Sequence, residues 1–540
     1  MDNISPFTHI YRKGNYLLLF NPLTLEKHYL HKKDYSKIFK NKDLIKKGLI
    51  VGEDFNDDSY FNKIKKDILK WQRKPRISLC YLLLTGDCNY NCKYCFIESN
   101  LKEKNTYMTP ETAKKAIEFF KKNIDPEIKT KKIYFYGGEP LLNFQALKVA
   151  VEEARIQIPE ANLIIITNGA LLTKEIAEFL AKNKVHIGIS MDGPNKLNDK
   201  ARITYKSNEG SSDLTLRGIN ILKKLSINLS ISCTIGQHNI DNIENVMKYF
   251  INELGVKGIE FNIPKPTKYT KGLDPKRVAE QMIRSFEIAW VNDLSIDRIK
   301  RRKVIPFATK KPWIKDCAGY GQQIIVTPEG RVGPCHAFWP LNKFLNLTVD
   351  SDMKVIEHED WKEWNKRVAY NEPRCKYCEA ISLCGGGCAF NHYNEQEGIW
   401  NLDKTTCEFA KEVLNWLVWA YFEHRYYEEI NSENKKLIIK MPSWTDDKRY
   451  NAFLKKVTDG KLLKDYSDIN KIIKSIYEDK ERFLFILDKT ELVGIAYGNP
   501  IKYIFLKEYE DDGLINYASN KLKELNKKYL TGEDKQKNEL

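Results

Sequence analysis

The sequence has no long apolar run and no apolar segment at its beginning. A membrane-spanning helix needs about 20 consecutive apolar residues, and no stretch comes near that length. The first twenty residues carry scattered polar and charged side chains, unlike a secretory signal peptide. The absence of both features predicts a soluble cytoplasmic protein that does not associate with a membrane.

Acidic residues are too few to balance the basic ones. The chain has 88 Lys and Arg residues against 72 Asp and Glu residues, which gives a net charge of +16. Excess positive charge can attract nucleic acid or an anionic substrate. The lysines lie along the whole chain, often beside glutamates, and form no cluster with interleaved aromatic residues. The pattern favours a solvated surface over a nucleic-acid partner.

Histidine is scarce, with 9 residues, whereas cysteine is abundant, with 12. Ten of the cysteines form two groups with regular spacings, and Cys80 and Cys233 stand apart within predicted strands. Disulfides are disfavoured in a chain without a secretion signal. The sequence therefore predicts metal or cluster ligation by the ten grouped cysteines and a core position for the other two.

Six apolar, β-branched segments alternate with amphipathic helical segments between residues 76 and 263. The predicted strands are Ile77–Thr85, Lys132–Tyr136, Leu163–Thr167, Val185–Ser190, Asn228–Thr234 and Gly258–Ile263. The predicted helices include Thr109–Asn123, Leu142–Arg155 and Asn239–Leu254. Repeated β-then-α units imply a parallel sheet, and we expect an α/β fold with a partial (β/α)6 barrel related to the TIM barrel. In such barrels the chemistry lies at the carboxyl ends of the strands.

The 540 residues suffice for two to four domains. The barrel is expected over 76–264, a helical connection over 265–312, and a cysteine-rich domain with little periodicity over 313–410. A small N-terminal module is expected over 1–72, with a strand at Tyr16–Phe20. A long helix is predicted at Glu408–Glu429, and the domain division gives it residues 411–432. A further α/β module is expected over 433–530 and a charged tail over 531–540. The strands of that module are predicted at Lys436–Lys440, Phe483–Leu487 and Leu492–Tyr497.

The first cysteine group, Cys88, Cys92 and Cys95, directly follows the first predicted strand. Three thiolates on a four-iron cluster leave one iron without a protein ligand, so that a cofactor can bind there directly. A structural zinc site would need a fourth ligand near by, and the next histidine along the chain is His186. The spacing and the placement favour an iron–sulfur cluster over zinc.

The segment around these cysteines, TGDCNYNCKYCF, resembles the signature of the radical S-adenosylmethionine (SAM) superfamily. Other marks of that family follow in order after successive strands. The resemblance covers about residues 76–263 and implies the following SAM-binding residues: Tyr94 near the adenine; Gly137, Gly138, Glu139 and Pro140 as the turn that meets the methionine amino group; Ser190 and Asp192 at the ribose and methionine end; and Arg202 at the methionine carboxylate.

The family resemblance implies a chemistry as well as a binding site. In such enzymes a reduced 4Fe–4S cluster gives an electron to S-adenosylmethionine, which splits into methionine and a 5′-deoxyadenosyl radical. That radical removes a hydrogen atom from a carbon that acid–base groups cannot deprotonate. The resemblance is specific for the cofactor and for this first step, and it leaves the substrate open.

The second cysteine group resembles the SPASM domain, which follows the barrel in many peptide-modifying radical enzymes. By this resemblance one auxiliary 4Fe–4S cluster is held by Cys375, Cys378, Cys384 and Cys407, and a second by Cys317, Cys335 and Cys388. The alternative is a pair of zinc ribbons, for which CxxC pairs are equally natural. Behind a radical SAM barrel, three 4Fe–4S clusters in all are favoured.

The auxiliary group departs from its relatives at two places. Residues 318–334 contain no cysteine, although some relatives supply a fourth ligand there, so either another residue fills the place or the iron is open. We hypothesise an open iron that binds a substrate thiolate. Relatives that form formylglycine on sulfatases have an aspartate base directly after the second ligand, where this chain has His336. His336 is either the base or an ordinary polar neighbour of the cluster.

The resemblance favours an oxidoreductase that matures a ribosomally made precursor peptide, with a thioether or other cross-link as product. Residues 1–72 resemble the leader-peptide docking module of such enzymes, with a structural cap as the alternative. A flavodoxin- or ferredoxin-type reductant would supply the electron. Three other functions remain open: formylglycine formation on a sulfatase, a radical reaction on RNA or a small molecule, and a non-enzymatic zinc or electron-transfer role.

Overall fold

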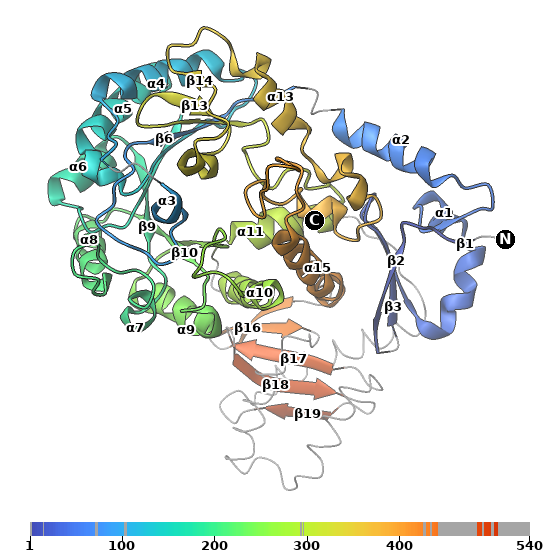
Figure 1. The fold of residues 1–540 in the computed structure, drawn as a ribbon. Helices are drawn as coiled ribbons and strands as arrows, with labels where there is room; N and C mark the ends of the chain where they lie inside the picture. The colour runs from blue at the N-terminus through green and yellow to red at the C-terminus, as the bar shows by residue number, and fades with distance from the viewer. Residues whose placement is uncertain are drawn as a thin grey trace. The chain divides into compact units, whose positions relative to one another are not determined.

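The computed structural model describes residues 3–14, 16–70, 74–101, 105–291, 294, 296–424, 428–432, 435–440, 483–488, 491–497 and 502–505. Two compact units are present (Figure 1). One unit comprises residues 1–21, 26–53 and 414–540, and the other comprises residues 22–25 and 54–413. The larger unit carries all of the predicted cluster cysteines and all of the predicted SAM contacts.

A nine-stranded sheet forms the centre of the larger unit. Its spatial order is β11-β10-β9-β8-β7-β6-β12-β13-β14. The strand bounds are β6(Leu79–Leu83), β7(Lys132–Tyr136), β8(Asn162–Thr167), β9(Val185–Ser190), β10(Leu229–Thr234), β11(Gly258–Asn262), β12(Gln323–Val326), β13(Arg331–Gly333) and β14(Leu347–Thr348).

Strands β6 to β11 are parallel to their neighbours and follow one another in chain order. All six predicted strands are present, and the prediction of a parallel α/β sheet is confirmed. The sheet curves as a partial barrel whose strand order ends at β11 on one side. The carboxyl ends of β6 to β11 therefore meet at one edge, where the cysteine loop and the predicted SAM contacts lie.

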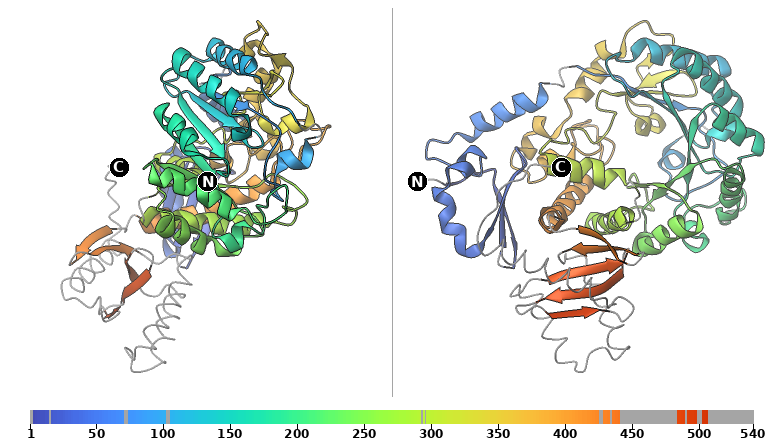
Figure 2. Two further views of the ribbon diagram at one scale, coloured as in Figure 1. Left: turned by 90° about the vertical axis from the view of Figure 1, so that its left-hand side faces the viewer. Right: turned by 180° about the vertical axis from the view of Figure 1, so that it is seen from behind.

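Four helices cover the outer side of the curved sheet (Figures 1 and 2): α4(Pro110–Asn123), α5(Phe144–Gln157), α6(Lys174–Lys182) and α8(Ser212–Lys224). Helix α4 begins where the sequence predicts, because the Thr109 hydroxyl accepts a hydrogen bond from the Thr112 N–H at 3.0 Å. Ala113, Ile117 and Phe120 form its buried face. Burial of Phe120 alone contributes roughly 1.5–3 kcal/mol.

The segment predicted as one helix over Asn239–Leu254 has three parts: η3(Ile240–Asn242), α9(Ile243–Lys248) and the π-helical η4(Tyr249–Glu253). The change of hydrogen-bond step at Tyr249 is confined to one π turn of five residues, which is too short to change the apolar periodicity of the segment. The following connection holds α10(Pro275–Val291), α11(Asp297–Ile299), η5(Lys300–Val304) and α12(Ile305–Thr309).

The cysteine-rich segment extends the barrel sheet. Strand β12 pairs parallel to β6, and β13 and β14 continue antiparallel. The low periodicity of this segment gives no sign of these three strands. The Trp361 indole N–H donates to the Gln323 carbonyl at 2.9 Å and fixes α13(Glu359–Lys366) against β12. The cysteines of this segment are thereby attached to the first barrel strand.

One helix of 13 residues, α2(Asp57–Leu69), and several short helical turns complete the larger unit. The turns are α3(Phe96–Asn100), η2(Pro140–Asn143), α7(Asn195–Asn198), η6(His336–Leu341), η7(Val355–Glu357), η8(Ala369–Asn371), η9(Pro373–Cys375) and α14(Ile381–Cys384). Asp58, in the first turn of α2, forms an ion pair with Lys376 at 2.9 Å. This pair joins α2 to the loop that carries Cys375 and Cys378.

In the smaller unit, β2(His9–Lys13), β3(Tyr16–Asn21) and β4(Glu26–His31) form an antiparallel sheet. A second strand pair joins β1(Asn3–Ile4) to β5(Ile50–Val51), and η1(Lys32–Lys40) and α1(Lys42–Lys46) complete the module. Leu17, Leu19, Ile38 and Leu44 are among its buried core residues. The predicted strand at Tyr16–Phe20 is confirmed as β3.

A five-stranded antiparallel sheet occurs near the carboxyl end: β15(Glu428–Ser432), β16(Lys435–Lys440), β17(Phe483–Asp488), β18(Glu491–Tyr497) and β19(Lys502–Phe505). The three strands predicted here are confirmed as β16, β17 and β18. The lysine-rich helices predicted around them, and the tail over 531–540, lie outside the described residues.

The long helix α15(Lys404–His424) starts earlier than predicted, because the Asp403 carboxylate accepts from the Thr406 N–H at 3.1 Å and caps it. Its predicted end at Glu429 is wrong, since Glu428 and Glu429 belong to β15. Among the helices that the structure describes, α15 included, none is long and apolar enough to cross a membrane.

Candidate functional site

The loop that carries Cys88, Cys92 and Cys95 leaves the carboxyl end of β6. The Lys93 N–H donates to the Ala201 carbonyl at 2.9 Å, so the loop pairs with the segment that carries Arg202. Desolvation and the neighbouring Glu139, Cys92 and Cys95 raise the pKa of the Cys88 thiol. The structure thus brings the three predicted cluster cysteines into mutual electrostatic range at the carboxyl edge of the sheet.

The glycine pair after β7 packs closely on this loop. The Gly138 N–H donates to the Thr85 carbonyl at 2.8 Å, and Gly137 has a φ of +135°. A Cβ at Gly138 would lie 2.0 Å from the Asp87 carbonyl oxygen. The backbone directly before Cys88 therefore requires glycine at position 138, whether or not the turn also meets a ligand.

Glu139 is buried and joins the ends of β7 and β8. Its carboxylate accepts from the Thr167 hydroxyl at 2.6 Å, from the Asn168 N–H at 2.8 Å and from the Leu141 N–H at 3.0 Å. Burial raises the pKa of Glu139 to about 7, and these three hydrogen bonds oppose the rise. Pro140 follows as the first residue of η2. Glu139 therefore fixes the turn that holds the two glycines in place.

Asp192 and Arg202, both predicted SAM contacts, form a buried ion pair. The Arg202 Nε lies 2.9 Å from Asp192 Oδ2, and its Nη2 donates to Oδ1 at 3.1 Å. Burial would raise the pKa of Asp192, but Arg202 and His238 outweigh burial and hold it below its usual range. The remaining Arg202 nitrogen, Nη1, lies 4.0 Å from Cys92 Sγ. The pair is thus charged at neutral pH and lies against the cysteine loop.

Tyr94 and His238 complete this network. The Tyr94 hydroxyl donates to Asp192 Oδ2 at 2.5 Å, and its ring stacks on His238 with centroids 5.6 Å apart. The His238 Nε2 lies 3.1 Å from the same Asp192 oxygen. Sequence reasoning missed His238, although it follows β10 at the carboxyl edge of the sheet. Ser190, the last residue of β9, is half-buried at the same edge.

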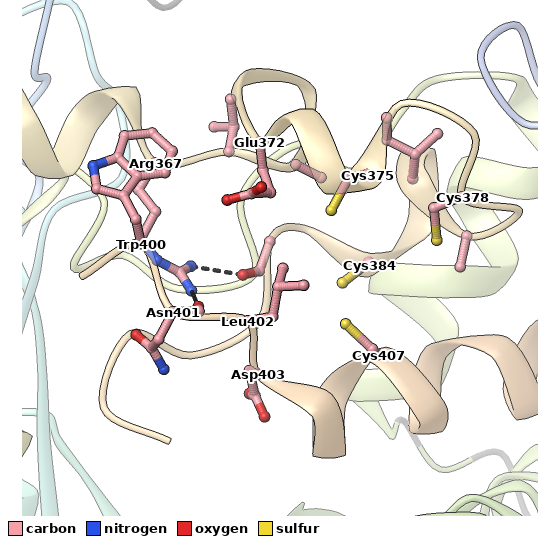
Figure 3. Close-up of a pocket in the computed structure, with 15 residues that line it drawn as sticks. Arg367, Glu372, Cys375, Cys378, Cys384, Trp400, Asn401, Leu402, Asp403 and Cys407 are labelled. Atoms are coloured by element: carbon pink, nitrogen blue, oxygen red, sulfur yellow. Dashed lines mark hydrogen bonds between the residues drawn. The ribbon is translucent and has the colours of Figure 1, made fainter. Parts of the chain in front are cut away.

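Four cysteines predicted as ligands of one auxiliary cluster line a single pocket of about 520 Å³, part of which is open solvent. Figure 3 shows the sulfur atoms of Cys375, Cys378, Cys384 and Cys407 directed toward a common space. Cys384 and Cys407 interact through their side chains, which lowers the pKa of Cys384 and raises that of Cys407. The arrangement provides the four soft thiol donors that a closed cluster requires.

Arg367 organises the wall of this pocket. It donates to the Tyr320 hydroxyl and the Gly386 carbonyl, both at 2.6 Å, and to the Asn401 carbonyl at 3.1 Å. Gly385, Gly386 and Gly387 all have positive φ angles, of 71°, 84° and 68°. This left-handed run separates Cys384, which lines the pocket, from Cys388, which does not.

Cys388 lies with Cys317 and Cys335 in the second predicted auxiliary group. Desolvation raises the pKa of Cys335, and Cys317 and Cys388 raise it further, which places the three sulfurs near one another. Lys265, three residues beyond β11, lies with its Nζ 2.8 Å from Cys388 Sγ. Sequence reasoning missed this lysine, because a single residue has no spacing signature.

His336, the predicted base, lies among aromatic side chains. Its ring centroid is 4.9 Å from that of Tyr81, 5.6 Å from Tyr136 and 6.0 Å from Phe96. Desolvation, together with the positive charge of Lys265, lowers the pKa of His336 to about 3, so the imidazole is neutral at pH 7. Its Nδ1 is buried without a hydrogen-bond partner. A neutral ring in this place has a nitrogen lone pair that can accept a proton.

The twelve cysteines include no disulfide. Cys80 and Cys233 are fully buried in β6 and β10, as expected for core residues. Within the part of the chain that the structure describes, no three His, Cys, Asp or Glu side chains converge closely enough to hold a single metal ion.

Sequence comparison gives a family match and curated relatives. Residues 82–250 match the model of the radical SAM superfamily. The radical SAM cyclopropyl synthase TigE of Paramaledivibacter caminithermalis is 26% identical over 434 residues, which cover 76% of this chain and 89% of that relative. A cysteine-type anaerobic sulfatase-maturating enzyme of Clostridium perfringens is 25% identical over 380 residues, 67% of this chain and 99% of the relative.

Comparison with solved structures agrees on the fold. The structure of polyhistidine-tagged anSMEcpe with bound AdoMet has a TM-score of 0.55 at 22% identity, and the match covers 64% of this chain and 94% of that chain. Native anSMEcpe with bound AdoMet and the Cp18Cys peptide gives a TM-score of 0.53 at 22% identity, over 64% of this chain and 99% of that chain. These likenesses show that about two thirds of the chain shares the fold of those structures.

Proposed function

Because the chain belongs to the radical SAM superfamily and, within it, to the SPASM-type maturases, we propose that it modifies a ribosomally synthesised peptide, with a cross-link such as a thioether as product. The observation that carries this proposal is the division of ten cysteines into three groups within one fold. One group lies on the loop after β6, one lines the four-cysteine pocket, and one surrounds Lys265. A radical SAM enzyme that only generates radicals needs just the first group.

The family implies S-adenosylmethionine and a 4Fe–4S cluster, and we assign the cluster to Cys88, Cys92 and Cys95. Three thiol donors on one loop, beside a buried charged pair, fit a cluster with one iron left for the cofactor. When bound, the cluster and the cofactor supply a 5′-deoxyadenosyl radical that removes a hydrogen atom from carbon.

The chain's own residues would bind and orient the cofactor. We assign this role to Tyr94, Gly137, Gly138, Glu139, Pro140, Ser190, Asp192 and Arg202. Asp192 already accepts from Arg202 and Tyr94, so its part is to hold those two side chains in place. The Arg202 Nη1, which does not contact Asp192, is the nitrogen best placed to meet a carboxylate near Cys92.

We assign two auxiliary 4Fe–4S clusters to the remaining seven cysteines. The pocket of Cys375, Cys378, Cys384 and Cys407 offers a complete ligand set. The group of Cys317, Cys335 and Cys388 offers three ligands, and its open iron would bind a substrate thiolate. Addition of a cysteine-containing substrate peptide should then change the spectrum of this cluster, and an unchanged spectrum would count against an open iron.

His336 is our candidate for the proton acceptor. Its ring is neutral, and among the described residues its buried Nδ1 has no hydrogen-bond partner. The low pKa makes it a weak base, so the proposal rests on its place beside Cys335 and on Tyr81 and Tyr136, which orient the ring by contact. His336→Phe keeps an aromatic ring in the same place but removes both nitrogens. We expect it to retain 5′-deoxyadenosine formation and to lose most peptide product, by about 10²-fold or more.

The N-terminal sheet is our candidate for leader-peptide docking. A peptide strand added beside β2 or β4 would gain main-chain hydrogen bonds. Removal of residues 1–72, which include both edge strands β2 and β4, should weaken binding of the full precursor and leave cleavage of S-adenosylmethionine unchanged. Unaltered precursor binding would argue for a structural cap. We place the enzyme in the cytoplasm, with a flavodoxin- or ferredoxin-type reductant.

The test of the function is a product analysis under anaerobic conditions. The reconstituted full chain, dithionite and S-adenosylmethionine should yield 5′-deoxyadenosine, and Cys95→Ala should abolish it. With a candidate precursor peptide, a cross-link removes two hydrogen atoms from the peptide, which mass spectrometry detects. The matched control is Cys80→Ala, because Cys80 is buried in β6 away from the three cysteine groups. If 5′-deoxyadenosine forms but no peptide product appears, cleavage of S-adenosylmethionine is confirmed and a precursor peptide is rejected as the substrate.

A second candidate, formylglycine formation on a sulfatase, is supported by the match over 99% of a cysteine-type sulfatase-maturating enzyme. The histidine at position 336 argues against it, because the aspartate base of those relatives is expected there. Incubation with a sulfatase-derived cysteine peptide separates the two functions. An aldehyde trapped on that peptide would favour the second candidate.

A further inference from the structure

Among the described residues, Lys265 is the cation that contacts the three-cysteine group. Its Nζ lies 2.8 Å from Cys388 Sγ, and Cys335 and Cys317 also act on it electrostatically. The side chain is partly buried. The backbone behind it is fixed, because the Thr270 hydroxyl donates to the Lys265 carbonyl at 3.0 Å. Lys265 is therefore held against the cysteines by the ordered loop that follows β11.

The contact distance distinguishes two possible roles for Lys265. A separation of 2.8 Å between nitrogen and sulfur is direct contact, within reach of a hydrogen bond from an ammonium donor to a thiolate acceptor. A lysine that ligated the fourth iron would bind at the corner of the cluster that no cysteine occupies, away from Cys388. The geometry therefore indicates a hydrogen bond to an existing ligand and not a fourth ligand.

The four-cysteine pocket has a different arrangement. Its nearby buried lysine, Lys303, donates to the Leu383 carbonyl at 2.5 Å and not to a thiol. Arg367 on the pocket wall donates to carbonyl and hydroxyl oxygens. The two groups of cysteines thus differ in one respect that matters for an iron–sulfur cluster, which is direct hydrogen bonding from a cation to a ligand sulfur.

We propose that Lys265 is a positioning residue that donates a hydrogen bond to Cys388 and raises the reduction potential of the auxiliary cluster held by Cys317, Cys335 and Cys388. The inference rests on the cluster assignment of the proposed function. Reduction adds one negative charge to a cluster, and a nearby cation with a hydrogen bond to sulfur stabilises that charge. The three-cysteine cluster is then the better electron acceptor of the two auxiliary clusters.

The test is a redox titration of the reconstituted full chain, followed by electron paramagnetic resonance. Lys265→Met keeps the length of the stem and removes the charge and the donor. We expect the midpoint potential of one auxiliary cluster to fall by at least about 59 mV. For one electron this corresponds to a tenfold decrease in the equilibrium constant of reduction. The other two midpoints and the iron count should stay unchanged. Lys265→Arg keeps a charge and a donor and should therefore retain most of the wild-type midpoint potential. Lys268 is an exposed lysine of the same loop, and Lys268→Met should behave as the wild type.

Two results would overturn the inference. Unchanged midpoints in Lys265→Met with a full complement of iron would show that the contact does not tune the cluster. Loss of about four irons in that variant alone would show that Lys265 is a ligand or a structural residue. If the wild-type protein holds zinc in place of the auxiliary clusters, the proposed function is rejected as well. This outcome is distinguishable from failure of the inference on Lys265, because it is seen without any substitution.

Discussion

At the scale of the residue, close backbone contact decides which side chains the cysteine loop tolerates. Gly138 has the carbonyl oxygen of Asp87 where its Cβ would be. The loop before Cys88 and the turn after β7 therefore form one packed unit. This packing requires glycine at position 138 independently of the S-adenosylmethionine contact that we propose for the turn.

Gly138→Ala should lower the free energy of unfolding by about 3 kcal/mol or more and reduce iron at the first cluster, because the Cβ would lie 2.0 Å from a backbone oxygen. Urea unfolding and iron analysis measure both effects. The matched control is Gly52→Ala, where no atom lies within 4 Å of the added Cβ. Equal stability of the two variants would contradict the packing argument.

The raised pKa of Glu139 predicts that the free energy of unfolding depends on pH. Burial raises its pKa from 4.5 to about 7, so the folded chain binds this proton more tightly than the unfolded chain. The stability that the group contributes is present below pH 4.5 and is lost as the pH rises toward 7, by about 3 kcal/mol in all. The urea midpoint of the cluster-free protein, compared between about pH 5 and 7, should show this slope.

In Glu139→Gln this slope should disappear, whereas Glu118→Gln on the exposed side of α4 should keep it. The Gln variant should also be less stable at low pH, because its amide nitrogen would face an N–H or O–H donor. If Glu139→Gln keeps the wild-type slope, a different group titrates in this range.

At the scale of the element, the extension of the barrel sheet by β12 joins the cysteine-rich segment to the strand that leads into the Cys88 loop. Strand β12 pairs with β6, directly before the loop of Cys88. Behind it, Arg367 connects Tyr320, Gly386 and Asn401. The four-cysteine pocket therefore depends on one buried guanidinium.

Arg367→Met should lose about four of the irons and several kcal/mol of stability, because each buried oxygen left without a donor costs about 1–3 kcal/mol. Iron analysis and thermal unfolding of the same preparation test this. The neighbouring Lys366→Met removes only an exposed ion pair with Glu363 at 3.1 Å, so we expect less than about 1 kcal/mol. A full iron content in Arg367→Met would contradict the organising role.

The sequence predicts those elements whose signal is local. Strand β7 alternates buried and half-buried residues over Lys132–Tyr136, and Thr109 caps α4 within its own segment. Strand β12 has only four residues, all buried, and its partner β6 lies far away in sequence, so no periodicity reveals it. Likewise the cysteines are found from their spacing, whereas Lys265 and His238 reach the site only through the fold.

At the scale of the whole molecule, the arrangement of the cysteines bears on the cofactors. The barrel places three cysteines at the carboxyl end of β6, and the extension gathers seven more in two groups. Each group has the number of thiol donors that our cluster assignment needs, which is four in one group and three in each of the other two. The function that we propose requires all three clusters in one chain.

The most direct test is to purify the protein without oxygen, reconstitute it, and count iron, sulfide and zinc per chain. We predict about twelve irons with matching sulfide, three clusters of four. About four irons with zinc would retain the radical centre and make residues 313–410 a structural zinc module. Zinc alone, with no iron after reconstitution, would contradict the central claim.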